Sequence, residues 1–150
     1  HSPVSGLVAI DPGRSKCGLV LSDAEGAGLL AAGVLPAAEC LAHLQAWSAA
    51  QRCHTVLLGN GTGSGPWHQW LAPLPLRLIA VPETGTTLAA RRRYWQLEPP
   101  RGWRRLLPAG MRLPPRDVDD VVAQLLLERH LKGELHRHHC QWLPPGGERP

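Results

Sequence analysis

The sequence predicts an α/β fold built around one mixed sheet, and two observations carry this prediction. Three apolar segments follow one another near the N-terminus with only short polar turns between them, which indicates an antiparallel meander. After residue 35, apolar segments alternate with segments of helical periodicity, which is typical of parallel strands joined by helices. The 150 residues are enough for one domain with a sizeable core.

The first strand and turn are the clearest local signal. Residues 7–10 are uniformly apolar, as in a strand that is covered on both faces. Asp11 stands at the end of this strand, and Pro12 and Gly13 favour a tight turn. Residues 17–21 then return as a second strand. A carboxylate here either caps the turn through its own backbone or meets a cation, because an unpaired buried charge is costly.

The remaining elements follow from apolar runs, prolines and glycines. The third strand (29–35) completes the meander, and Pro36 suits the first turn of the helix after it. The expected later elements are a helix at 37–52, a strand at 55–59, a short helix at 67–71, a strand at 76–81, a helix at 88–96, an irregular proline-rich loop at 99–115 and a helix at 117–132. This makes five strands. We expect residues 1–6 to be a flexible N-terminus, 7–132 to be the domain and 133–150 to be a poorly ordered tail.

The composition narrows the setting. No apolar run is long enough to cross a membrane, and the first residues lack the features of a signal peptide, so we expect a cytoplasmic protein without a membrane partner. The four cysteines form no Cys-x-x-Cys pair, which argues against a zinc ribbon. The glycine-rich segment 59–65 lacks the spacing of a nucleotide-binding loop. It either supplies flexibility or lets backbone amides approach a phosphate.

Positive charge is concentrated in one part of the chain. Eight of the arginines lie between residues 91 and 116, against one acid, Glu98. Such a concentration favours an anionic partner such as nucleic acid, and Trp95 and Trp103 could stack on its bases. The alternative is a solvated arginine face with both tryptophans in the core. The candidate nucleic-acid-binding residues are Arg14, Lys16, Arg91, Arg92, Arg93, Arg101, Arg104 and Arg105.

Acidic residues occur at three places where an α/β fold brings side chains together. Asp11 ends the first strand, Glu83 follows the last strand, and Asp117, Asp119 and Asp120 begin the final helix. Clustered carboxylates repel one another, and a hard divalent cation such as Mg²⁺ or Mn²⁺ reverses that cost. One or two such ions could support hydrolysis of a phosphodiester. Alternatively, the aspartates serve only the helix N-terminus and Glu83 pairs with one of the arginines at 91–93.

Three motifs resemble the YqgF/RuvC-like nucleases of the ribonuclease H superfamily. Residues 7–23 are similar to the opening of these proteins, with Asp-Pro-Gly at 11–13 and Val-Leu-Ser-Asp at 20–23. Glu83 with Thr86 and Thr87 resembles their Glu-x-x-Thr-Thr element. Residues 118–131 resemble their closing helix, which has an acid at its start. The resemblance covers residues 7–132.

The resemblance implies a ribonuclease H-like fold and metal-dependent cleavage of phosphodiester bonds. Asp11 matches the first catalytic aspartate and Glu83 the central glutamate. YqgF proteins indicate Asp119 as the last acid, whereas the Asp-x-x-Asp spacing of RuvC proteins indicates Asp117 and Asp120. Metal ligands are therefore expected among Asp11, Glu83, Asp119 and Asp120. Pro82 and Thr84 stand where YqgF proteins have an acid and an arginine beside the glutamate.

The function implied by the resemblance is a magnesium- or manganese-dependent endonuclease acting on structured RNA, by analogy with YqgF proteins the precursor of small-subunit ribosomal RNA. A Holliday junction resolvase acting on four-way DNA is one alternative, and it requires a symmetric dimer. The other alternative is a catalytically inactive nucleic-acid-binding member of the fold. The sequence is compatible with a monomer or a homodimer.

Overall fold

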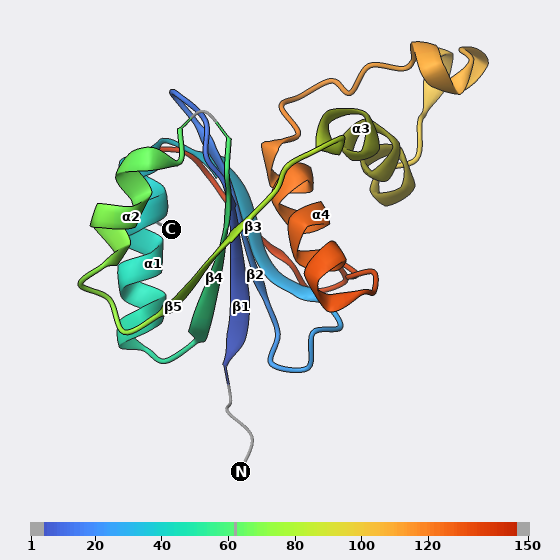
Figure 1. Cartoon of the computed structure of the whole chain (residues 1–150). Coiled ribbons are helices and arrows are strands. Elements are labelled where there is room, and N and C mark those ends of the chain that lie inside the picture. The colour runs from blue at the N-terminus through green and yellow to red at the C-terminus, as the bar shows by residue number, and fades with distance from the viewer. Residues whose placement is uncertain (1–4, 62, 147–150) are drawn as a thin grey trace.

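The computed structural model describes residues 5–61 and 63–146, in which the chain forms a mixed sheet with helices on both faces (Figure 1). The strand order is β5-β4-β1-β2-β3-β6. The strands are β1 (Gly6–Asp11), β2 (Cys17–Ser22), β3 (Leu29–Leu35), β4 (Cys53–Gly59), β5 (Arg77–Val81) and β6 (Gln141–Leu143). The mixed α/β architecture is confirmed, and the predicted count of five strands is wrong because there are six in the described residues.

The strand directions place several strand ends at one edge of the sheet. β1, β2 and β3 form the predicted antiparallel meander. β4 lies parallel to β1, and β5 lies parallel to β4. The carboxyl ends of β1, β4 and β5 therefore share an edge with the beginning of β2, and Asp11 pairs with Gly18 there. We call this edge the Asp11 edge.

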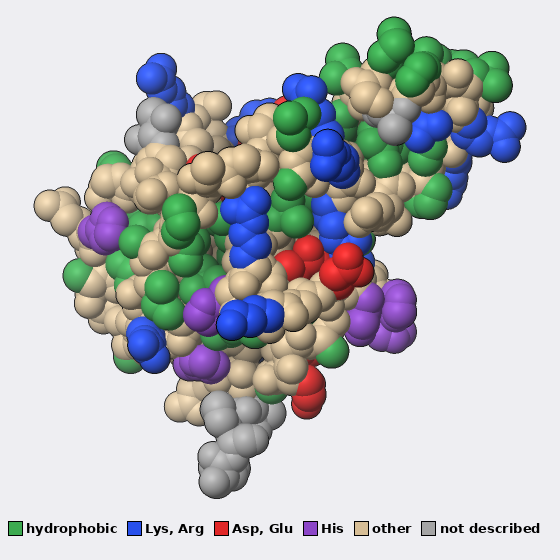
Figure 2. All heavy atoms as spheres, turned by 45° about the vertical axis from the view of Figure 1, so that its right-hand side comes forward, with side chains coloured by type: hydrophobic (Ala, Val, Ile, Leu, Met, Phe, Trp, Pro, Cys, Tyr) green, Lys and Arg blue, Asp and Glu red, His purple; other side chains and the backbone are tan. Residues whose placement is uncertain are grey.

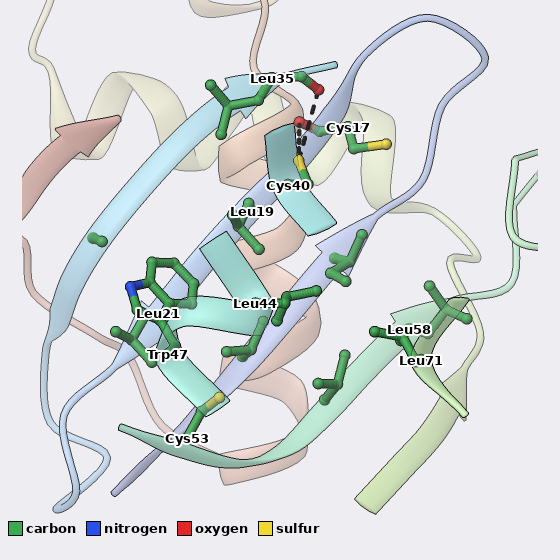
Figure 3. Close-up of a cluster of buried hydrophobic side chains, with 14 of the residues drawn as sticks. Cys17, Leu19, Leu21, Leu35, Cys40, Leu44, Trp47, Cys53, Leu58 and Leu71 are labelled. Carbon is green, nitrogen blue, oxygen red and sulfur yellow. Dashed lines mark hydrogen bonds between the residues drawn. The ribbon is translucent and has the colours of Figure 1, made fainter. Parts of the chain in front are cut away.

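Both faces of the sheet are buried, as the uniformly apolar β1 predicted. Helices α1 (Ala37–Ala49) and α2 (Gly65–Leu71) cover one face, and α4 (Asp119–Leu131) covers the other (Figure 1). Val8 and Ile10 pack in the core under α1 and α2, whereas Ala9 packs under α4. Figure 3 shows the first of these cores, where the Cys40 thiol lies against the carbonyl oxygens of Cys17 and Leu35.

Helix α3 (Thr86–Leu97) packs on the outer side of α4 rather than on the sheet. The proline-rich segment that follows it projects from the body together with α3 (Figure 1). It contains two short 3-10 helices, η1 (Gly102–Leu106) and η2 (Ala109–Met111). This segment was predicted as an irregular loop, and its other parts have that character.

The segment after α4 is more ordered than the sequence indicated. Leu135 is buried against α4, and Leu143 is buried in the core under α1. β6 pairs in parallel with β3 and extends the sheet by one strand. Two buried leucines and the otherwise unpaired edge of β3 together explain why this short polar-looking segment folds. Positions 147–150 of the expected tail lie outside the described residues.

The expected flexible N-terminus also lies largely outside them, at residues 1–4, while β1 already begins at Gly6. In the part of the chain that the structure describes, no helix has the length and apolar character needed to cross a bilayer.

Candidate active site

Two of the three predicted acidic positions meet directly at the Asp11 edge. Asp11 is the last residue of β1, and Glu83 lies two residues beyond the end of β5. Their carboxyl groups are within hydrogen-bonding reach of each other. The two strands are separated only by β4, so strand order alone brings the acids together although they are distant in the sequence.

The position of Glu83 is determined by its backbone contacts. The hydroxyl and the amide of Thr86 both donate to the carbonyl oxygen of Glu83, at 2.8 and 3.2 Å. Arg129 of α4 donates to the carbonyl oxygen of Thr84 at 3.1 Å. Gly85 between them has a φ of 72°, a left-handed conformation that glycine adopts without strain. The Glu-x-x-Thr pattern is thus a tight turn that fixes the glutamate, and α4 anchors this turn from the other side.

The glycine-rich segment after β4 makes room for the Glu83 side chain. A methyl group on Gly59 would overlap Glu83 Oε2, and one on Gly61 would lie 2.6 Å from Oε1. A methyl group on Gly63 would lie 2.5 Å from the carbonyl oxygen of Gly13, in the turn after Asp11. Close approach to Glu83 and to this turn therefore explains Gly59, Gly61 and Gly63, for which the predicted reasons were flexibility or phosphate contact.

Asp119 reaches the same edge through a second close approach. The first turn of α4 lies directly on β2, where a methyl group on Gly18 would overlap the carbonyl oxygen of Asp119. Gly18 is in turn the register partner of Asp11. The glycine therefore allows the N-terminus of α4 to lie beside the end of β1.

Asp11 lies in an unfavourable electrostatic environment for a carboxylate. Burial raises the pKa of Asp11, and the charges of Glu83 and Asp119 raise it further, to about 8. Burial also raises the pKa of Asp119, assisted by the charges of Asp117 and Asp120 and opposed by Lys16. Asp11 consequently carries a proton at neutral pH when no cation is bound.

Among the described residues, none of these three carboxylates forms a salt bridge. Glu83 Oε2 is buried without a hydrogen-bond partner. A buried acceptor without a partner costs free energy, and a divalent cation with oxygen ligands would remove that cost. The donor set of Asp11, Glu83 and Asp119 therefore fits Mg²⁺ or Mn²⁺. The part of the chain that is described contains no preformed cluster of three His, Cys, Asp or Glu side chains close enough to hold an ion.

The other two predicted aspartates are placed differently. Asp120 is completely buried, and Arg116 and Arg137 donate to its two carboxylate oxygens at 2.8 and 2.9 Å. Asp117 is exposed, and Lys16 contacts it at 2.6 Å. Asp120 already has two cationic partners, and Asp117 has one. Of the three candidates for the last acid, the geometry singles out Asp119 as the one whose carboxylate lacks a salt bridge.

Asp120 belongs to a buried polar network that ties the C-terminal segment to α4. Arg137 also donates to Gln124 at 2.7 Å. Gln124 and the amide of Leu135 both donate to Glu128, which pairs with Arg93 at 2.9 Å. The network supports the inner face of α4, and it shows that one arginine of the 91–93 run has a structural partner rather than a free guanidinium.

The remaining predicted nucleic-acid-binding residues fall into two groups. Arg14 and Lys16 are exposed in the loop beside Asp11. The others, apart from Arg93, lie on α3 and the projecting segment, where Figure 2 shows basic and apolar side chains intermixed. Within that group the exposed side chains are Arg91, Arg92, Arg101 and Arg105, while Arg104 is partly buried and lies over the ring of Trp103.

The two tryptophans of the basic region differ. Trp103 is exposed, as expected of a residue that could stack on a base. Trp95 packs edge-on against Tyr94 and donates to the carbonyl oxygen of Arg112 at 3.2 Å. Trp95 thus belongs to the packing between α3 and the projecting segment.

A comparison of the chain with models of known protein families gives no match, and a comparison with curated proteins gives none either.

Proposed function

We propose that this protein is a ribonuclease H-like endonuclease that depends on Mg²⁺ or Mn²⁺ and cleaves structured RNA. The observation that carries the proposal is the convergence of Asp11, Glu83 and Asp119 at one sheet edge without a salt bridge to any of the three among the described residues. Repulsion between carboxylates is expensive, and a fold that serves stability alone would pair them, as it pairs Asp120.

The fold supports the proposal through its topology. A three-stranded antiparallel meander is followed by two parallel strands on the β1 side, and helices cover both faces, as the resemblance to YqgF and RuvC proteins implies. The added β6 lies at the opposite edge, beyond β3, and leaves this part of the arrangement unchanged.

The three acids would hold the ions, and each has a structural reason for its position. The end of β1 positions Asp11, the turn at 83–86 positions Glu83, and the first turn of α4 positions Asp119. When bound, the divalent ions would activate water and stabilise the charge that develops on the phosphate. Because Asp11 has a pKa of about 8, ion binding at neutral pH displaces its proton, so ion affinity should rise with pH.

The basic residues supply the second part of the proposal. Arg14 beside Asp11 and the arginines of the projecting segment are exposed and available to phosphates. RNA binding should therefore weaken steeply as salt concentration rises. Arg129, held against Thr84, brings a guanidinium to the turn that carries Glu83. YqgF proteins have a basic residue directly beside this glutamate, and the present sequence lacks it. Arg129 lies at the same turn.

The decisive experiment measures cleavage of a structured RNA, such as precursor ribosomal RNA, with Mn²⁺ and with a chelator. We expect cleavage only with the metal, and a loss of at least a hundredfold in Asp11→Asn, Glu83→Gln and Asp119→Asn. Calorimetric titration with Mn²⁺ should show weaker binding in the same variants. Glu25→Gln is the matched control, because Glu25 is exposed in the turn between β2 and β3, at the opposite end of the sheet.

Two results would contradict parts of this proposal. Cleavage that persists unchanged in Asp11→Asn would remove the acid site as its source. Tight RNA binding with no metal-dependent cleavage of any RNA tested would favour a nucleic-acid-binding protein that lacks activity.

A further inference from the structure

A pocket lies beside the candidate active site, and nothing in the mechanism above uses it. It has a volume of about 290 Å³, and its lining comes from the loop after β1, the end of β3, the segment before α4 and the segment around β6. We call it the Trp142 pocket. Sites for larger ligands start near 300 Å³, so this pocket suits one small planar group.

The register of the sheet places this pocket next to the three acids. Asp11 of β1 pairs with Gly18 of β2, and Gly18 pairs with Val34 of β3, which lines the pocket. Neighbouring strands lie ~4.8 Å apart, so Val34 is roughly 10 Å from Asp11 along this row. That is comparable to the size of one nucleotide. A strand with a phosphate at the acids could thus place a neighbouring base in the pocket.

The walls of the pocket have flat apolar surfaces. Trp142 on β6 is 43% exposed, and Pro36 and Pro145 also line the pocket. The guanidinium of Arg116 lies 4.9 Å from the centre of the Trp142 ring, so the two form one stacked wall. Indole rings and guanidinium planes are the surfaces on which proteins stack unpaired bases.

The charge of the pocket favours a nucleotide over an uncharged apolar ligand. Lys16 and Arg116 contribute two cations to the lining. Lys16 pairs with Asp117, the one acid of the lining, and Arg116 pairs with Asp120, which is buried outside it. The side chain of Lys16 is 54% exposed while its ammonium group contacts Asp117, so this group remains accessible to a phosphate. An apolar slot with cations at its rim is complementary to a base that is attached to an anionic backbone.

We infer that the Trp142 pocket binds one unpaired nucleobase of the RNA strand, next to the phosphate that the acids engage. This inference rests on the proposed function and specifies its substrate: the RNA must offer an unpaired nucleotide beside the cleaved bond. It also gives β6 a functional role, because this strand contributes the aromatic wall.

The test separates base binding from backbone binding. Affinity is measured for a labelled oligouridylate and for an all-abasic oligoribonucleotide of the same length and charge, with a chelator present so that no cleavage occurs. We expect the wild type to prefer the oligouridylate. Trp142→Leu should weaken oligouridylate binding roughly fivefold or more, because stacking on one base is lost, and should leave abasic binding unchanged.

Two further variants make the result specific. Trp142→Phe keeps an aromatic face and should retain most of the preference for bases. Trp70→Ala is the matched control, since Trp70 is 40% exposed on α2, away from the pocket. It should change neither affinity. A thermal melt of each variant verifies that it folds.

The outcomes are distinct from those of the nuclease assay. Equal binding of both oligomers by the wild type, or an equal effect of Trp142→Leu on both, would overturn the pocket assignment even if cleavage is found. A base preference that depends on Trp142 would support the assignment even if the nuclease assay finds no cleavage.

Discussion

Asp119 and Asp120 are neighbours in the first turn of α4, yet their surroundings differ completely. Asp120 points into the protein, where Arg116 and Arg137 satisfy both of its oxygens. Asp119 has no salt bridge among the described residues, the charges of Asp117 and Asp120 raise its pKa, and its own charge raises the pKa of Asp11. The two residues share charge, helix and position relative to the helix N-terminus. What separates them is the sign of the charges that the rest of the fold brings to each.

This difference distinguishes a carboxylate that stabilises the fold from one that is available for chemistry. Pairing with arginine lowers the cost of burying Asp120. The acid site at the Asp11 edge has the opposite property, because Glu83 and Asp119 make Asp11 harder to ionise. Such an arrangement is unfavourable without a cation, which is why it indicates function.

The largest expected effect is on stability, and it should differ between variants of Asp119 and Asp120. Asp120→Asn should lower the free energy of unfolding by about 3 kcal/mol or more, because Arg116 and Arg137 lose the charge that compensates them. Asp119→Asn should leave it unchanged or raise it, while abolishing cleavage. Urea denaturation of both variants measures the difference. Equal losses of stability would show that the two carboxylates have the same role.

An intermediate effect is expected from the glycine that makes room for Glu83. Gly59→Ala should cost about 1–3 kcal/mol, because the added methyl group overlaps the Glu83 carboxylate. Cleavage should fall with it. The same substitution in a Glu83→Ala background should cost less, since the overlapping group is then absent. If Gly59→Ala costs the same stability with and without the Glu83 side chain, Gly59 is required only for its backbone conformation.

The smallest effect concerns pH in the metal-free protein. The folded protein keeps the Asp11 proton up to about pH 8, whereas the unfolded chain releases it near pH 3.8. The folded state therefore binds more protons between these values, and this group makes stability fall as pH rises through that window. Asparagine does not titrate. Asp11→Asn should thus be roughly 1–2 kcal/mol more stable than the wild type at pH 8, with exposure of the site limiting the gain.

At pH 4 the two proteins should be equally stable, because the carboxyl group is then largely protonated in the folded state. Melting curves in a chelator over this pH range make the measurement. Added Mn²⁺ should raise the melting temperature of the wild type and not of Asp11→Asn. A wild type that is the more stable of the two at pH 8 in chelator would contradict the repulsion between Asp11, Glu83 and Asp119.

Much of the fold could be predicted because its signals are local. The apolar run at 7–10 became β1, and the helix expected at 117–132 is α4, at Asp119–Leu131. Pro36 immediately precedes α1, as its preference for the start of a helix indicates. The segment around β6 was missed because Leu135 stands alone among polar residues and the apolar pair Trp142 and Leu143 is too short to indicate a strand. The burial of Leu135 and Leu143 depends on contact with α4, β3 and α1, which no local pattern reports.

The candidate site shows the same division. The sequence predicts that acids stand at a strand end, after a strand and at a helix start, because strands and helices have characteristic residue patterns. The choice among Asp117, Asp119 and Asp120 could not, because it depends on the direction of each side chain and on arginines that approach from elsewhere in the chain. Arg137 lies in the segment that was expected to be unstructured, so its contact with Asp120 had no signal in the sequence.

Residue order alone thus established where strands and helices form and which of them end in carboxylates, since hydrophobic periodicity and turn chemistry act over a few residues. Tertiary structure decided which carboxylates are neutralised and which are left facing one another. Charges interact through space and not along the chain, so the environment of Asp11, Glu83, Asp119 and Asp120 exists only once the sheet, α4 and β6 have come together.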